Sequence, residues 1–159
     1  MRKNSSCIFC DIVRSPEEMC HKVWESETHL AFLSIFPNTE GVTVVIPKHH
    51  ITSYVFDATE EEICSLMYAA KIVAKKIDEV FSDVGRTGVI FEGFGVDHLH
   101  VKLFPMHGTG NMSKWRPLEN NRNEYYTEYP GFLSSHDSFR ADDGDLKEIA
   151  EKIRKSLDM

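Results

Sequence analysis

The sequence has no long hydrophobic run and no excess of positive charge. No apolar stretch approaches the roughly 18 residues of a membrane-spanning helix, so we expect no membrane partner. The basic start is followed by Cys7–Asp11 instead of the apolar stretch of a signal peptide. Lysine and arginine number 18 against 25 acidic residues, which gives a net charge of −7. Because non-specific binding to duplex nucleic acid requires clustered cations, such a partner is not expected.

Cysteine is also scarce, with four in 159 residues. Small secreted domains that depend on disulfides are much richer in cysteine, so we expect a reduced, cytoplasmic protein. Hydrophobic residues make up 42% and charged residues 27%, a composition typical of globular proteins and not of disordered chains. The length predicts one compact domain over residues 1–159.

The hydrophobic pattern predicts an α+β fold. A short helix at 7–14 should stop at Ser15-Pro16, and a long helix should begin at Thr59, where Glu62 completes a capping box. A last helix should start near Asp142. We expect strands in an antiparallel meander at 22–25, 28–33, 42–46, 88–92 and 98–104. The apolar stripe of the long helix should consist of Ile63, Leu66, Met67, Ala70, Val73, Ala74, Ile77, Val80 and Phe81.

The segment from 97 to 105 has the most informative pattern. Alternate side chains of a strand share a face, so His98, His100 and Lys102 should form one polar row. One interpretation is an ordinary exposed sheet face. The other is a site for phosphate or another anion, with a histidine as nucleophile or base, because neutral imidazole exists at cellular pH. The lysine would then neutralise the oxygens that carry the charge.

A C-x-x-C pair, Cys7 and Cys10, lies near the N-terminus, and a pair of histidines follows the strand at 42–46. Thioredoxin-like chemistry needs the pair between a strand and a helix, and nothing strand-like precedes it. As half of a zinc site the pair lacks two ligands, for which His50 and His98 are candidates. The alternative is that both cysteines are buried thiols.

Three ordered motifs resemble those of the histidine triad (HIT) family. Residues 7–13 (CIFCDIV) are similar to the N-terminal segment of zinc-containing bacterial members. Residues 31–37 (AFLSIFP) and 44–51 (VVIPKHHI) resemble the central block of the family. Residues 98–104 (HLHVKLF) resemble its histidine motif, with lysine in the place of the third histidine. The resemblance covers about residues 7–107 and leaves the tail and C-terminal helix at 108–159 unmatched.

This resemblance implies a small α+β domain with an antiparallel meander sheet and one long central helix, which forms a homodimer. Such proteins bind a purine nucleotide or nucleotide conjugate and act at the α-phosphorus of nucleoside phosphoramidates or dinucleoside polyphosphates. The resemblance implies that His100 is the nucleophile, that His98 orients it and that Lys102 holds phosphate oxygens. It also implies a structural zinc without an open coordination position, held by Cys7, Cys10, His50 and His98.

The resemblance implies that the nucleotide is contacted by Phe32, Ser34, Ile35 and Lys102. His107, near the end of the last strand, is a further candidate for contact with phosphate. Phe32, Ile35 and Phe9 could line an apolar pocket for the base, although residues of these types are more often found in the core. The chain departs from the family at several places. Lys102 is a poorer proton donor than histidine, Ser34 replaces an aspartate that meets the ribose, Val42 replaces a histidine, and the loop at 93–96 lacks a serine.

Three functions therefore remain open. The first is a nucleotidyl hydrolase or transferase that forms a covalent intermediate on His100. The second is a non-catalytic nucleotide-binding or regulatory module with a structural zinc, suggested by the departures from the family pattern. The third is a zinc-stabilised interaction domain without a small ligand.

Overall fold

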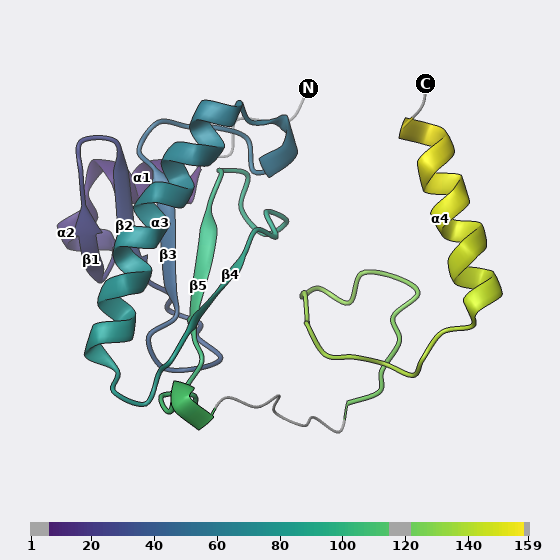
Figure 1. Ribbon diagram of the computed structural model, residues 1–159. Coiled ribbons are helices and arrows are strands. Elements are labelled where there is room, and N and C mark those ends of the chain that lie inside the picture. Colours follow the sequence, from purple (N-terminus) through teal and green to yellow (C-terminus); the bar gives the residue numbers. More distant parts are fainter. Residues whose placement is uncertain (1–6, 115–121, 158–159) are drawn as a thin grey trace. The chain divides into compact units, whose positions relative to one another are not determined.

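The computed structural model describes residues 7–114 and 122–157. The chain divides into two compact units, Met1–Arg116 and Pro117–Met159 (Figure 1). Among the described residues, no helix has both the length and the apolar character needed to cross a membrane. One domain over residues 1–159 stays a prediction.

The first unit is built on a five-stranded sheet in which every neighbouring pair of strands is antiparallel. The strands are β1 (Lys22–Glu25), β2 (His29–Leu33), β3 (Thr43–Pro47), β4 (Thr87–Ile90) and β5 (Val101–Pro105). Their order is β1-β2-β3-β5-β4. The predicted α+β fold with an antiparallel sheet is thus confirmed, and β1 to β3 form the meander. The chain then crosses to the edge and returns, so that β5 lies in the interior of the sheet.

The long helix α3 (Glu60–Val80) crosses one face of this sheet (Figure 1). Its predicted capping box is confirmed: the Thr59 side chain accepts from the Glu62 amide, and the Glu62 carboxylate accepts from the Thr59 amide. Buried residues of α3 share one core cluster with sheet residues such as Val101 and Leu103 and with Leu99, which precedes β5. The predicted stripe is wrong at Val80, the last residue of α3, and at Met67, which are 74% and 37% exposed. The buried residues of α3 are Leu66, Ala69, Ala70, Val73 and Ile77.

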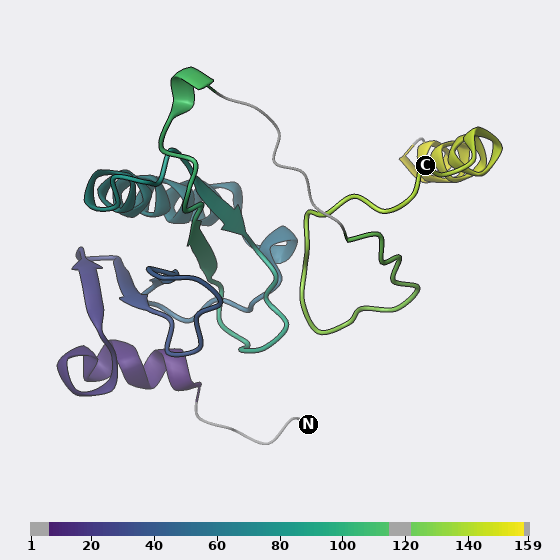
Figure 2. The same cartoon turned by 90° about the horizontal axis from the view of Figure 1, so that it is seen from below.

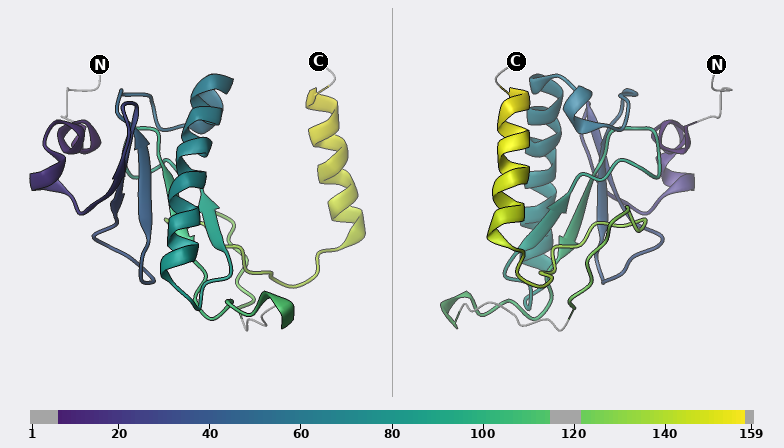
Figure 3. Two further views of the ribbon diagram at one scale, coloured as in Figure 1. Left: turned by 60° about the vertical axis from the view of Figure 1, so that its left-hand side comes forward. Right: turned by 90° about the vertical axis from the view of Figure 1, so that its right-hand side faces the viewer.

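The opposite face of the sheet is covered by α1 (Ile8–Arg14), as Figure 2 shows from below and Figure 3 from the side. Ile12 of α1 joins a second core cluster with residues of β2 and β3. The helix stops at Ser15 as predicted, but a second short helix, α2 (Pro16–Met19), follows at once. Proline is well suited to the first position of a helix, where its missing amide hydrogen costs nothing.

Several predicted strand boundaries shift. β5 begins at Val101, so His98 and His100 precede the strand that was expected to contain them. Their segment is instead held by a backbone hydrogen bond from Leu99 to Ile51 at 2.8 Å. β3 extends to Pro47, which is buried. Short 3-10 helices lie at Val55–Asp57 and Met112–Lys114.

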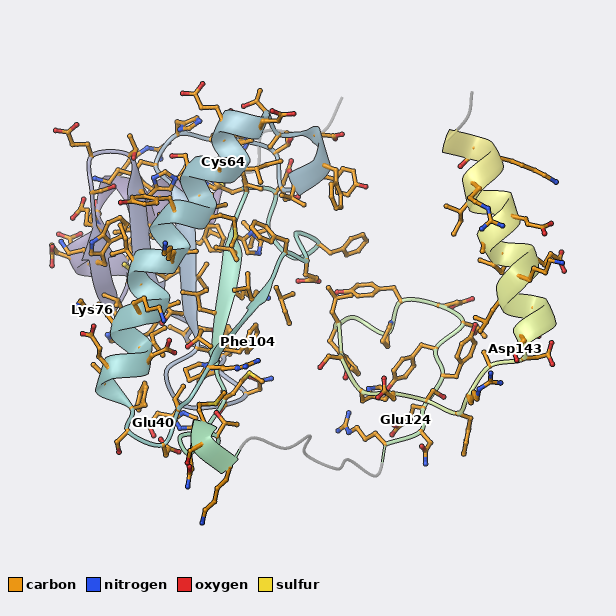
Figure 4. The ribbon with its side chains drawn as sticks, in the orientation of Figure 1. Glu40, Cys64, Lys76, Phe104, Glu124 and Asp143 are labelled. Atoms are coloured by element: carbon orange, nitrogen blue, oxygen red, sulfur yellow. The ribbon has the colours of Figure 1, made fainter. Side chains whose placement is uncertain are left out.

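The second unit ends in α4 (Asp143–Leu157), which begins one residue after the predicted position. The Asp142 carboxylate accepts from the Gly144 amide at 2.7 Å, next to Asp143, which Figure 4 labels at the start of the helix. Before α4, the Tyr126 ring packs edge to face on Phe132 and His136. The sequence leaves the roles of Trp115 and of the Tyr125-Tyr126 pair open; Trp115 lies outside the described residues.

Candidate functional site

The first turn of α1 brings two thiols to two imidazoles. The donor atoms of Cys7, Cys10, His50 and His98 all lie within 4.8 Å of one another. The Cys7 sulfur is 3.4 Å from His98 Nδ1, and the Cys10 sulfur is 3.5 Å from His50 Nδ1 and 3.6 Å from His98 Nδ1. The four predicted zinc ligands are therefore together, although they come from three separate segments of the chain.

The three sulfur–nitrogen distances are close to those around a tetrahedral zinc ion. With zinc–sulfur bonds of about 2.3 Å and zinc–nitrogen bonds of about 2.0–2.1 Å, tetrahedral angles separate sulfur from nitrogen by about 3.5–3.6 Å. The three sulfur–nitrogen distances, 3.4, 3.5 and 3.6 Å, lie within about 0.1 Å of this separation. Two cysteines and two histidines are also a donor set typical of structural zinc, so this cluster could hold the metal.

His98 is held in the orientation that a metal ligand needs. It has no exposed surface, and its Nε2–H donates to the carbonyl of Pro47 at 2.9 Å. Because that nitrogen carries the proton, Nδ1 presents its lone pair to the two sulfurs. Burial lowers the pKa of the His98 imidazole, which favours the neutral form that binds metal.

His100 is fixed through the other nitrogen of its ring. Its Nδ1–H donates to the backbone carbonyl of His98 at 2.7 Å, so the lone pair is on Nε2. The residue is 3% exposed, and burial lowers the pKa of its imidazole. Within the described part of the chain, no hydrogen bond occupies Nε2. A neutral ring with a fixed, unbonded lone pair is the arrangement that a nitrogen nucleophile requires.

Lys102 lies on the same face of the sheet as the second core cluster. It pairs with Val44 across β3, and Val44 pairs with Phe32 across β2, so the three side chains share one row. Its ammonium lies 3.5 Å from the Glu92 carboxylate, and the lysine side chain is 37% exposed. The row therefore places one partly exposed cation beside apolar side chains.

The predicted nucleotide contacts on the β2 side have different environments. Phe32 is 5% exposed and belongs to the second core cluster, whereas Ile35 is 68% exposed. The hydroxyl of Ser34 accepts from the Phe36 amide at 3.2 Å, so it closes its own turn. The structure thus leaves an apolar side chain exposed at 35 and gives the Ser34 hydroxyl a backbone partner.

Phe9 contributes contacts that sequence reasoning missed. Its ring packs edge to face on His100, with centroids 5.3 Å apart, and on His98, with centroids 5.8 Å apart. It also packs on Phe32 at 5.6 Å. The position of Phe9 between the two cysteines in the sequence is the only signal that could have pointed to this contact.

His107 is not brought to these residues. It follows the far end of β5, where its Nδ1 lies 3.1 Å from an Asp83 carboxylate oxygen and its Nε2 lies 3.0 Å from the Glu40 carbonyl. Figure 4 labels Glu40 at the end of the first unit beyond Phe104 of β5. Both ring nitrogens therefore have protein partners away from His100.

The chain is similar to known proteins over most of its length. A model of the HIT domain matches residues 15–109. The chain belongs to the HIT family. It is 36% identical over 135 residues to an uncharacterized HIT-like protein of Mycoplasma genitalium, a match that covers 76% of this chain and 94% of the relative. It is 36% identical over 101 residues to the adenosine 5'-monophosphoramidase hnt1 of Schizosaccharomyces pombe, covering 63% of this chain and 74% of that one.

A solved structure bears on the metal cluster of this HIT protein. The zinc-bound histidine triad family protein from Mycobacterium smegmatis superposes with a TM-score of 0.59 at 26% identity, covering 72% of this chain and 84% of that one. A member of the family with this fold thus binds zinc, and the present chain has a Cys/His cluster consistent with zinc binding.

Proposed function

We propose that this HIT protein is a nucleotidyl hydrolase or transferase that acts at the α-phosphorus of nucleoside phosphoramidates or dinucleoside polyphosphates. The observation that carries the proposal is His100, whose Nδ1–H donates to the His98 carbonyl at 2.7 Å and leaves Nε2 as the nucleophile. Related chains named adenosine 5'-monophosphoramidase support a hydrolase of this type.

The reaction has two steps. First, His100 Nε2 forms a bond to the α-phosphorus while the bond from phosphorus to the leaving amine or phosphate breaks. A leaving amine takes its proton from water, and the hydroxide formed in this way accepts the proton that is released when water attacks in the second step. Water then attacks the nucleotidyl-histidine, the nitrogen–phosphorus bond breaks, and its electron pair returns to Nε2. The products are a nucleoside monophosphate, the free leaving group and neutral His100.

Other residues hold the reacting groups. The Lys102 ammonium neutralises charge on the phosphoryl oxygens. To do so, it must leave its ion pair with Glu92 and bind the substrate instead. His98 orients the nucleophile through its backbone carbonyl. A structural zinc, held by Cys7, Cys10, His50 and His98, would fix the segment that precedes β5.

The alternative is a non-catalytic module that binds nucleotides. The ion pair between Lys102 and Glu92 favours it, because the carboxylate occupies the cation that a transition state would use. Ser34 adds to this argument, since a hydroxyl that closes its own turn is a weaker acceptor for a ribose than an aspartate.

Intact-protein mass spectrometry separates these functions. The full chain is mixed briefly with adenosine phosphoramidate, guanosine phosphoramidate or a dinucleoside polyphosphate, beside His100→Asn and the matched control His21→Asn at an exposed position. We expect a nucleotidyl adduct or released mononucleotide with the wild type and with His21→Asn only. Product formation by His100→Asn excludes the covalent role. Binding of mononucleotide without any product supports the module.

We also propose a homodimer. β4 is an edge strand with one partner in the described sheet, and its Val89 is 43% exposed. An edge of this kind can pair with a second copy. Light scattering of Val89→Lys should show dissociation, whereas Val23→Lys on the opposite edge strand, at 44% exposure, should not. A wild type with the mass of one chain would refute the dimer.

A further inference from the structure

The first turn of α1 contacts two different parts of the site. Cys7 and Cys10 face His50 and His98 in the metal cluster. Between them in sequence, Phe9 packs its ring on His100 at 5.3 Å, with the ring planes at 86°. One turn of helix therefore touches both the metal ligands and the candidate nucleophile.

Two contacts orient the His100 ring, which is 3% exposed. Its Nδ1–H bond to the His98 carbonyl fixes one edge of the imidazole. That bond alone would allow the ring to tilt about the donor direction, because hydrogen bonds to carbonyl oxygens tolerate a broad range of angles. The perpendicular Phe9 ring lies beside the imidazole and limits this tilt.

Phe9 lies between the core and the metal cluster. Together with Val13 it packs on the second core cluster, which contains Ile12. Cys7, the N-cap of α1, makes no capping hydrogen bond with its side chain, and Cys7 and Cys10 flank Phe9 in the sequence and face His50 and His98. A bound metal would therefore hold the backbone on both sides of Phe9.

We propose that Phe9 is a positioning residue, through which metal occupancy of the Cys7, Cys10, His50 and His98 cluster holds the His100 ring. The assignment of His100 as nucleophile rests on the proposed function, whereas the coupling between metal and ring does not. A second route is available, since His98 is both a metal ligand and the hydrogen-bond partner of His100. The two routes make different predictions for a Phe9 variant.

The test compares wild type, Phe9→Ala and the control Val13→Ala, each zinc-loaded and after chelation. Val13 lies on the same helix and packs on the second core cluster. The structural readout is the imidazole nitrogen NMR signal of His100 at one fixed pH, and the kinetic readout separates kcat from KM. In wild type and Val13→Ala, we expect chelation to shift the His100 signal and to lower kcat about ten-fold, with KM less affected.

In Phe9→Ala, the zinc-loaded protein should already give the displaced signal and the low kcat, and chelation should change little further. Full retention of the chelation effect in Phe9→Ala would overturn the proposal in favour of the route through His98. If chelation or the alanine variant unfolds the chain, zinc-loaded Phe9→Leu decides. A displaced His100 signal at full zinc content supports the proposal, and an unchanged signal refutes it. Because the NMR shift needs no turnover, failure of the proposed function is seen separately as absent product in every variant.

Discussion

Lys102 stands where the family motif has a histidine, and its ammonium lies 3.5 Å from the Glu92 carboxylate. The carboxylate is the less exposed partner, with 15% of its side chain accessible. The pair therefore keeps the local charge balanced, and a phosphate that approaches Lys102 must compete with Glu92.

Glu92→Gln should strengthen the binding of a mononucleotide. The substitution removes the competing negative charge and keeps the shape of the side chain, so the dissociation constant of AMP should fall by a few-fold, as expected for an ion pair worth up to about 1 kcal/mol. Calorimetric titration measures it. Lys102→Gln is the opposite control and should weaken binding. Equal affinity of Glu92→Gln and wild type would mean that Lys102 does not contact phosphate.

Metal removal should destabilise the protein. Purified without chelator, the chain should contain about one zinc ion, measured by elemental analysis, and Cys10→Ser should lose it with a lower melting temperature. Cys64→Ser is the matched control, since Cys64 is exposed on α3, where Figure 4 labels it, and is outside the cluster. A metal-free wild type, or equal melting temperatures for both variants, would contradict the zinc assignment.

The contact between His107 and Asp83 should make stability depend on pH. The His107 ring donates hydrogen bonds to the Glu40 carbonyl and to the Asp83 carboxylate, and these two bonds, in this order of size, raise the pKa of His107. The bond from His107 in turn lowers the pKa of Asp83. The stability contributed by a histidine with a raised pKa is fully present below the unfolded pKa of about 6.5, and it is lost as pH rises through the folded pKa. The stability contributed by an aspartate with a lowered pKa is present above the unfolded pKa of about 3.9, and it is lost as pH falls through the folded pKa.

The contribution of this pair should therefore be greatest between about pH 4 and 6.5. Burial lowers the pKa of His29, His98 and His100, so the contribution of these residues to stability rises with pH. Comparison of wild type with a His107 variant removes that contribution. The measurement is the melting temperature of wild type minus that of His107→Gln at pH 6 and pH 8. The difference should be larger at pH 6, and a difference that grows toward pH 8 would be inconsistent with the pair.

Thr59→Ala should lower the free energy of unfolding by about 1 kcal/mol, because it removes the side-chain cap of α3. Denaturant unfolding measures the change. Thr59→Ser keeps the hydroxyl and should recover most of it. If both variants lose the same stability, the methyl packing and not the cap is responsible.

Local sequence signals predicted the elements whose cause is local. The α3 start follows from Thr59 and Glu62, which cap each other within one turn, and β3 follows from its β-branched run. α2 has no signal of its own, because Ser15-Pro16 is compatible both with the end of α1 and with the start of a new helix. The placement of β5 between β3 and β4 had no local signal, since it depends on which strands pair after the crossover.

The candidate site likewise contains residues that local sequence patterns indicate and contacts that they do not. The C-x-x-C spacing and the motif resemblance identified the residues that meet in the metal cluster. No spacing pointed to the packing of Phe9 on His100 or to the Asp83 partner of His107, because each joins side chains far apart in the chain.

The contact between Cys7 and His98 joins residues that are 91 positions apart. A bond that closes so long a loop restricts the unfolded chain strongly, so a metal held there acts as a cross-link as well as a ligand-organising ion. It also sets an order of assembly. Cys7 and Cys10 are synthesised before the two histidines, and the full set of native partners is complete only after the chain has been made past His98.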